Sequence, residues 1–224
     1  MPVLARLPAW VWLGAWVLAF VAGTVNIVGL LGFQHQAITH LTGNSSLLAA
    51  AIVNSDPGGA TSLGLLMASF VAGAFLSGCI IQDDTLRLGR RYGLALAIVS
   101  ALLVVAAHEL AAGHIGGMYA AACACGLQNA MASTYSGSVV RTTHVSGMFT
   151  DLGIAIGHVA RRLPVDSRRL KLCATVITGF LAGGVAGAST FHQFGMATLY
   201  LPAAITGTIA LLYAIYRVTR QTTA

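Results

Sequence analysis

Two short stretches, one in each half of the chain, carry the same polar residues in the same order. The first is Thr39–His40–Leu41–Thr42–Gly43 and the second is Thr143–His144–Val145–Ser146–Gly147. Each contains Thr-His, an aliphatic residue, a hydroxyl residue and glycine, and a short apolar run follows each. Because histidine can bind polar ligands and carry protons near neutral pH, the symmetric pair His40 and His144 predicts contact with a substrate or a proton. Two histidines with structural hydrogen bonds are the alternative.

Both motifs also look like the starts of short helices. Gly43 and Gly147 suit a sharp turn before a helix. The N–H groups at a helix start, together with the helix dipole, favour an anionic group on a ligand. Helix capping without binding is the alternative, and the two roles do not exclude each other. The hydroxyl and amide residues suited to N-cap positions are Thr42, Asn44, Ser45 and Ser146.

Asp151 lies in the apolar run behind the second motif, at the place where the first half has Leu47. A carboxylate within a membrane is rare and costly when unpaired. It therefore predicts a proton-coupling group paired with His144 or Arg141. The alternative is that Asp151 only complements the helix dipole.

The sequence contains no constellation for a metal, a cofactor or covalent catalysis. No carboxylate or second histidine stands at ligand spacing from His40 or His144. Nucleophile elbows, zinc-protease motifs and phosphate-binding loops are also missing. We therefore expect no metal, no cofactor and no enzymatic activity.

The similarity between the halves extends to both sides of the motifs, in the same order. This indicates two homologous halves, residues 1–112 and 113–224. The amides Asn26, Gln128 and Asn129 either hold helices together or face a cavity beside the motifs. The further matches are Gly23-x-x-Asn26 with Gly126-x-x-Asn129, and Phe70-x-Ala72-Gly73 with Phe180-x-Ala182-Gly183.

The composition is that of a membrane protein. Hydrophobic residues make up 57% of the chain and charged residues 8%, with a mean hydropathy of +0.81. So few charges cannot cover the surface of a soluble protein of this size. The net charge of +6 comes from basic residues at the ends of apolar runs, without a basic face that carries aromatic residues. We therefore expect the lipid bilayer and not nucleic acid as its surroundings.

The apolar runs predict an all-α, polytopic bundle of six spanning helices. If only the six long runs span and the N-terminus is inside, every Lys and Arg falls on the inner side, as the positive-inside rule requires. Both termini are then cytoplasmic. Two shorter runs, 45–54 and 148–160, do not span. The six long runs are 9–33, 61–81, 93–111, 115–133, 170–190 and 196–216.

Three spans in each half place the second half upside down relative to the first, which is a recurring plan among transporters. The runs 45–54 and 148–160 would then be half-helices that enter from opposite sides and meet near the midplane. The alternative is that both runs are amphipathic helices lying in the membrane interface.

The motifs resemble those of the YoaK-like proteins of the bacterial inner membrane, over about residues 10–216. That family is a domain of unknown function, so the resemblance implies location and architecture but no substrate. We would expect Asp where this chain has Asn26, so coupling in this member would rest elsewhere, for example on Asp151. The motifs that carry the resemblance are Gly23-x-x-Asn26, His40–Asn44, Phe70–Gly73, Gly126–Asn129 and Arg141–Gly147.

The sequence thus predicts a secondary transporter or permease of a small molecule, surrounded by lipid and free to form a homo-oligomer. A non-transporting scaffold or accessory subunit is the second hypothesis, and an intramembrane enzyme using His144 and Asp151 is the third. The expected substrate-binding residues are Asn26, His40, Thr42, Gly43, Asn44, Gln128, Asn129, Arg141, His144, Ser146, Gly147 and Asp151.

Overall fold

The computed structural model describes residues 9–32, 36–81, 90–135 and 141–222, and this part of the chain is helical without a strand. The predicted all-α fold is confirmed. In chain order the elements are α1 (Ala9–Leu31), α2 (Leu41–Val53), α3 (Pro57–Ile80), α4 (Arg90–Ala111), α5 (Gly116–Tyr135), α6 (Val145–Ala160), α7 (Ser167–Phe194), the 3-10 helix η3 (Gly195–Leu199) and α8 (Tyr200–Thr222).

Helices occupy all six predicted long segments and both short ones. Within the described residues, four stretches are long and apolar enough to cross a membrane: Trp10–Leu31, Pro57–Ile80, Arg91–Ala111 and Ser167–Tyr216. The last of these contains α7, η3 and α8, while α5 is not among them. The chain is a membrane protein by this measure.

The main seam of the bundle lies between α1 and α7. A methyl group on Gly23 would overlap the carbonyl of Phe180, and one on Gly183 would overlap the carbonyl of Phe20. The hydroxyl of Thr24 crosses the seam to donate to the carbonyl of Gly183, at 3.0 Å. Glycine is needed here because the two backbones touch, which is how closely packed membrane helices associate.

The second seam, between α3 and α5, repeats the first one. A methyl group on Gly126 would overlap the carbonyl of Phe70, and one on Gly73 would overlap the carbonyl of Cys123. Gly126 and Gly73 are the sequence partners of Gly23 and Gly183, and Phe70 is the partner of Phe180. The matched residues of the two halves therefore take matched places in the packing.

Both α3 and α7 begin at an aspartate N-cap that follows a short helix. The Asp56 carboxylate accepts from the N–H of Gly59 at 2.9 Å, and that of Asp166 accepts from the N–H groups of Arg168 at 3.0 Å and Arg169 at 3.3 Å. Such caps satisfy donors that the helix itself leaves unpaired. They fix the hairpins α2–α3 and α6–α7.

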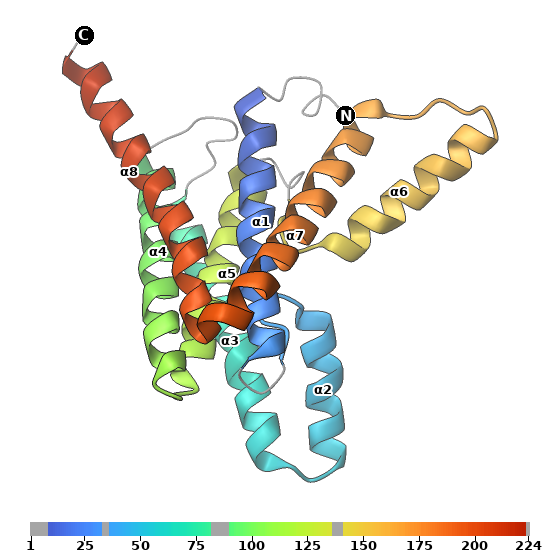
Figure 1. The fold of residues 1–224 in the computed structure, drawn as a ribbon. Helices are drawn as coiled ribbons and strands as arrows, with labels where there is room; N and C mark the ends of the chain where they lie inside the picture. Colours follow the sequence, from blue (N-terminus) through green and yellow to red (C-terminus); the bar gives the residue numbers. More distant parts are fainter. Residues whose placement is uncertain (1–8, 33–35, 82–89, 136–140, 223–224) are drawn as a thin grey trace.

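These two hairpins stand out from the bundle in opposite directions (Figure 1). Both short helices begin near mid-height; α2 runs toward the lower end of the view and α6 toward the upper end. Their main packing partners are α3 and α7 respectively. The N-terminal end of α1, the C-terminal end of α8 and the α6–α7 connection lie at the upper end, whereas the turns after α2, α4 and α7 lie in the lower part (Figure 1).

Candidate functional site

The two motif histidines begin the two short helices. His40 is the N-cap of α2 and His144 is the N-cap of α6, and neither side chain makes a capping hydrogen bond. Their backbones are similar, with φ −101° and ψ 75° at His40 and φ −93° and ψ 53° at His144. The predicted equivalence of the two histidines thus has a structural counterpart at the helix starts.

The predicted N-caps were wrong, because both short helices begin earlier than we expected, at Leu41 and Val145. Thr42, Asn44, Ser45 and Ser146 therefore lie inside the first turns. There, the Ser45 hydroxyl donates backward to the carbonyl of Leu41 at 2.8 Å instead of accepting from a downstream N–H.

Gly43 and Gly147 also lie inside the helices and not in turns before them, so that prediction was wrong as well. No atom lies near a methyl group built on Gly43, whereas one on Gly147 would overlap the imidazole of His144. Glycine at position 147 therefore lets the His144 ring lie over the first turn of α6.

The first motif is fixed by amide hydrogen bonds. The Asn26 Oδ1 atom accepts from the Thr39 N–H at 3.1 Å and from the Thr39 hydroxyl at 2.8 Å. The buried Asn44 donates through Nδ2 to the carbonyl of Ala37 at 2.9 Å. The His40 ring meets Phe180 of α7 edge to face, with ring centroids 5.8 Å apart. These contacts tie the chain before α2 to α1 and α7.

The second motif shows fewer such contacts among the residues that the structure describes. Asn129 Oδ1 and Thr142 Oγ1 are buried and have no hydrogen-bond partner within the described part of the chain. Arg141, His144 and Ser146 are exposed. Buried polar atoms are almost always paired, so these two oxygens mark the second motif as the less completely bonded one.

Gln128 joins two helices instead of facing a motif. Its Nε2 atom donates to the carbonyl of Leu18 in α1 at 2.8 Å, and its side chain is buried. This is the helix-joining role, one of the two we considered for the amides.

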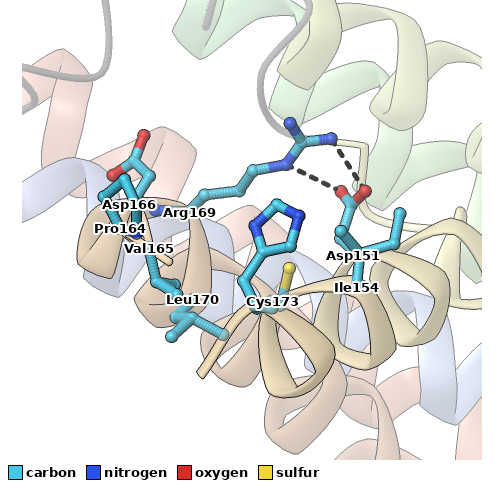
Figure 2. A pocket seen from close by; sticks show the side chains of 10 residues that line it. Asp151, Ile154, Pro164, Val165, Asp166, Arg169, Leu170 and Cys173 are labelled. Carbon is cyan, nitrogen blue, oxygen red and sulfur yellow. Dashed lines mark hydrogen bonds and ion pairs between the residues drawn. The ribbon is translucent and has the colours of Figure 1, made fainter. Parts of the chain in front are cut away.

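Asp151 pairs with Arg169 at the N-terminal end of α7, so the predicted pairing with His144 or Arg141 was wrong. Arg169 donates from Nη2 to Oδ1 at 2.7 Å and from Nε to Oδ2 at 3.1 Å, as Figure 2 shows. Such two-pronged contacts are the strongest form of carboxylate recognition by arginine. Asp151 is seven residues beyond the N-cap His144 and faces α7 across the hairpin, which explains the different partner.

A cavity of about 250 Å³ lies between α6 and α7 beside this ion pair (Figure 2). It brings a carboxylate, a guanidinium, an imidazole and a thiol to one hollow. Sequence reasoning missed Arg169. A hairpin of α6 and α7 would have indicated it, because α7 returns along α6 and brings position 169 beside position 151. The lining residues are Asp151, Ile154, Ala155, His158, Pro164, Val165, Asp166, Arg169, Leu170 and Cys173.

Some of the predicted site residues contact the other half of the chain: Gln128 bonds to Leu18, and the His40 ring contacts Phe180. Asn26 and Asn44 hydrogen-bond around the first motif, whereas Asp151, behind the second motif, pairs with Arg169. Among the described residues, no group of three or more His, Cys, Asp or Glu side chains could hold a metal ion. A shared substrate site between the motifs stays a prediction.

Comparison with known proteins gives one match. A family model described as a protein of unknown function, DUF1275, matches residues 14–212. No curated protein matches this chain, and no solved structure does.

Proposed function

We propose that this chain, which belongs to the DUF1275 family, is a secondary transporter or permease of a small molecule in the bacterial inner membrane. Membership confirms the resemblance to the YoaK-like proteins, since YoaK is a DUF1275 member. The family has no assigned function, so the proposal rests on the arrangement of the chain.

The observation that carries the proposal is the pair of short helices, α2 and α6. With 13 residues in α2 and 16 in α6, they are about 20 and 24 Å long, shorter than a hydrocarbon core of about 30 Å. Both start near mid-height and leave in opposite directions (Figure 1). Transporters with inverted repeats place the ends of such broken helices around the substrate.

The matched seams support an inverted repeat of six spans, with α1, α3 and α4 in one half and α5, α7 and α8 in the other. In this arrangement α2 and α6 re-enter the membrane without crossing it. Non-helical chain before each of them is tolerable at that depth only where protein or a wet cavity covers it. The buried contacts of Asn26 and Asn44 provide such cover in the first half.

The charge distribution supports cytoplasmic termini. Arg161, Arg162, Arg168 and Lys171 lie around the α6–α7 connection, at the same end as the start of α1 and the end of α8 (Figure 1). The turns at the other end carry Asp56 and Glu109. The positive-inside rule then assigns the upper end in Figure 1 to the cytoplasm.

In this mechanism the substrate lies between the starts of α2 and α6. Their N–H groups, uncapped by side chains, and the positive ends of the two helix dipoles would bind an anionic group of the substrate. His40 and His144 would contact its polar part, and Asn129 and Thr142 would offer it unused oxygen atoms. Rocking of one half against the other would expose this site to each side in turn.

The test is efflux from proteoliposomes loaded with a bacterial metabolite extract and analysed by mass spectrometry. We expect at least one metabolite to leave faster than from protein-free liposomes. His40→Ala and His144→Ala should each slow this efflux by about tenfold, the effect of losing about 1.4 kcal/mol of interaction. The matched control is His192→Ala, because His192 is an exposed histidine at the end of α7.

Two outcomes would contradict the proposal. Efflux equal to that of protein-free liposomes for every metabolite would favour the non-transporting scaffold. Efflux that both histidine variants leave unchanged would remove the motifs from the site.

A further inference from the structure

A groove runs between α1 and α7 toward their N-terminal ends. The two helices touch at Gly179, where a methyl group would meet the carbonyl of Trp16. Nearer the N-termini they leave a groove of about 500 Å³. Its lining residues are Trp12, Trp16, Lys171, Ala174, Thr175 and Thr178.

The groove combines one exposed cation with an apolar wall. The indole rings of Trp12 and Trp16 are half-buried, and Lys171 is exposed. The hydroxyls of Thr175 and Thr178 donate to carbonyls of their own helix, at 2.8 Å and 2.6 Å. They therefore need no hydrogen bond from a ligand.

Lys171 differs from the neighbouring cation Arg169 in having no ion pair to an acidic side chain. Arg169 forms an ion pair with Asp151, whereas no salt bridge to Lys171 occurs in the described part of the chain. Leu13 of α1 and Leu181 of α7 are exposed, so these helices present apolar side chains to the lipid. A ligand in this groove must therefore combine an apolar chain, which packs against the wall, with an anionic group, which pairs with the Lys171 ammonium.

We propose that the groove binds an anionic phospholipid. Its phosphate lies at the Lys171 ammonium, and its acyl chain follows Trp12, Trp16 and Ala174. Trp favours the depth of lipid headgroups, and basic pockets between membrane helices select anionic headgroups. The site requires only that the chain is embedded in lipid and does not depend on transport.

The second seam provides an internal comparison. By the matched glycines, Thr61 stands where α7 has Lys171, and Ile115 and Tyr119 stand where α1 has Trp12 and Trp16. The corresponding position thus has neither the cation nor the indoles. The lipid site belongs to one seam and to the end of the bundle where basic residues gather, which in a bacterial inner membrane faces anionic lipid.

The chain's own tryptophans can test this proposal. Its 3 tryptophans are Trp10, Trp12 and Trp16, all in α1. Trp10→Phe leaves only the two indoles of the groove as fluorophores. This protein, reconstituted in phosphatidylcholine vesicles, is titrated with dibrominated phosphatidylglycerol or dibrominated phosphatidylcholine, whose bromines quench indoles on contact.

We expect phosphatidylglycerol to bind about fivefold more strongly than phosphatidylcholine, the preference typical of one lysine at an anionic surface. Lys171→Gln, in the Trp10→Phe background, should bring the ratio close to one. Arg91→Gln is the matched control, because Arg91 is an exposed cation near the start of α4, outside the groove. It should leave the ratio unchanged.

Three results would overturn the proposal. Equal quenching by both lipids would show that the groove has no headgroup preference. A preference that persists in Lys171→Gln would show that this lysine does not bind the phosphate. An equal loss in Arg91→Gln and Lys171→Gln would show attraction by the overall charge and no site.

Discussion

The two half-helices begin in the same way, but different forces hold their surroundings. Before α2, the amide oxygen of Asn26 accepts hydrogen bonds from the N–H and the hydroxyl of Thr39. Asn44 donates to the carbonyl of Ala37. Before α6, the corresponding oxygen of Asn129 and the hydroxyl of the nearby Thr142 are buried without hydrogen-bond partners in the described part of the chain. There the link between half-helix and bundle is the ion pair of Asp151 with Arg169.

The two halves agree in some features and differ in others. Both halves keep the glycine seams, the histidine at each helix start and the aspartate cap after it. The polar contacts around the half-helix diverged. The first half has neutral, partly buried hydrogen bonds, while the second has a partly exposed ion pair and a cavity. If the protein transports, the second half is the one whose polar groups are available to a substrate.

The largest losses of folding free energy should come from substitutions in the two glycine seams. These seams are the feature that the two halves share. Gly73→Ala and Gly183→Ala each push a methyl group into a backbone carbonyl, so each should cost about 3 kcal/mol of folding free energy. Gly78→Ala and Gly184→Ala are the controls, because a methyl group there meets no atom within 4 Å. The measurement is unfolding of the purified protein in detergent.

The controls should be neutral or gain up to about 1 kcal/mol from the higher helix propensity of alanine. A large loss in Gly183→Ala together with a neutral Gly73→Ala would show that the two seams are not equivalent. That result would weaken the case for a structural repeat.

Substitutions of the two amides, Asn26 and Asn129, should have a medium effect on stability that differs between them. Asn26→Leu leaves the N–H and hydroxyl of Thr39 without an acceptor, so it should cost about 1–3 kcal/mol. Asn129→Leu replaces an amide whose oxygen has no hydrogen-bond partner among the described residues, so its cost should stay below about 1 kcal/mol. The same unfolding measurement gives both values, and equal costs would remove this difference between the halves.

Asn26→Asp is the conservative control for that pair. A carboxylate oxygen can accept the same two hydrogen bonds from Thr39, so this variant should retain more stability than Asn26→Leu. Asp was expected at this position from the resemblance, and the two bonds to Thr39 suit either residue. A loss as large as that of Asn26→Leu would show that the neutral amide itself is required.

Much of the fold could be predicted because local pattern determines it. The apolar runs located the helices, and the glycines and phenylalanines matched in the sequence lie at two seams with the same close backbone contacts. The helix starts could not be predicted, since several hydroxyls and an amide were better N-cap candidates than His40 or His144. Two of these candidates, Asn44 and Ser45, instead donate to the carbonyls of Ala37 and Leu41.

The partner of Asp151 could not be predicted for a different reason. Periodicity within α6 gives the face on which Asp151 lies, but not which residue of α7 lies opposite. That register depends on the length of the α6–α7 connection, which is longer than the one between α2 and α3. A local pairing with His144 or Arg141 was the simplest assumption from spacing, and the hairpin geometry overrode it.

The smallest stability effect should come from the ion pair, although it is the most visible difference between the halves. The side chain of Arg169 is 49% exposed and that of Asp151 is 23% exposed, and exposed pairs contribute about 1 kcal/mol or less. Asp151→Leu and Arg169→Gly install the residues of the first half, Leu47 and Gly59, and each should cost no more than this. A double-mutant cycle of unfolding free energies measures their coupling.

A coupling below about 1 kcal/mol would mean that the apolar face of α6 holds it against α7, as α2 is held against α3, because the charges would add little. The ion pair would then act mainly at the adjacent cavity. Its loss should change the rate of metabolite efflux while leaving the free energy of unfolding nearly the same. A coupling above about 3 kcal/mol would instead place the pair in a water-excluded setting, where breaking it strands a charge. In that case charge fixes the second half-helix as firmly as hydrogen bonds fix the first, and the two halves differ in chemistry but not in rigidity.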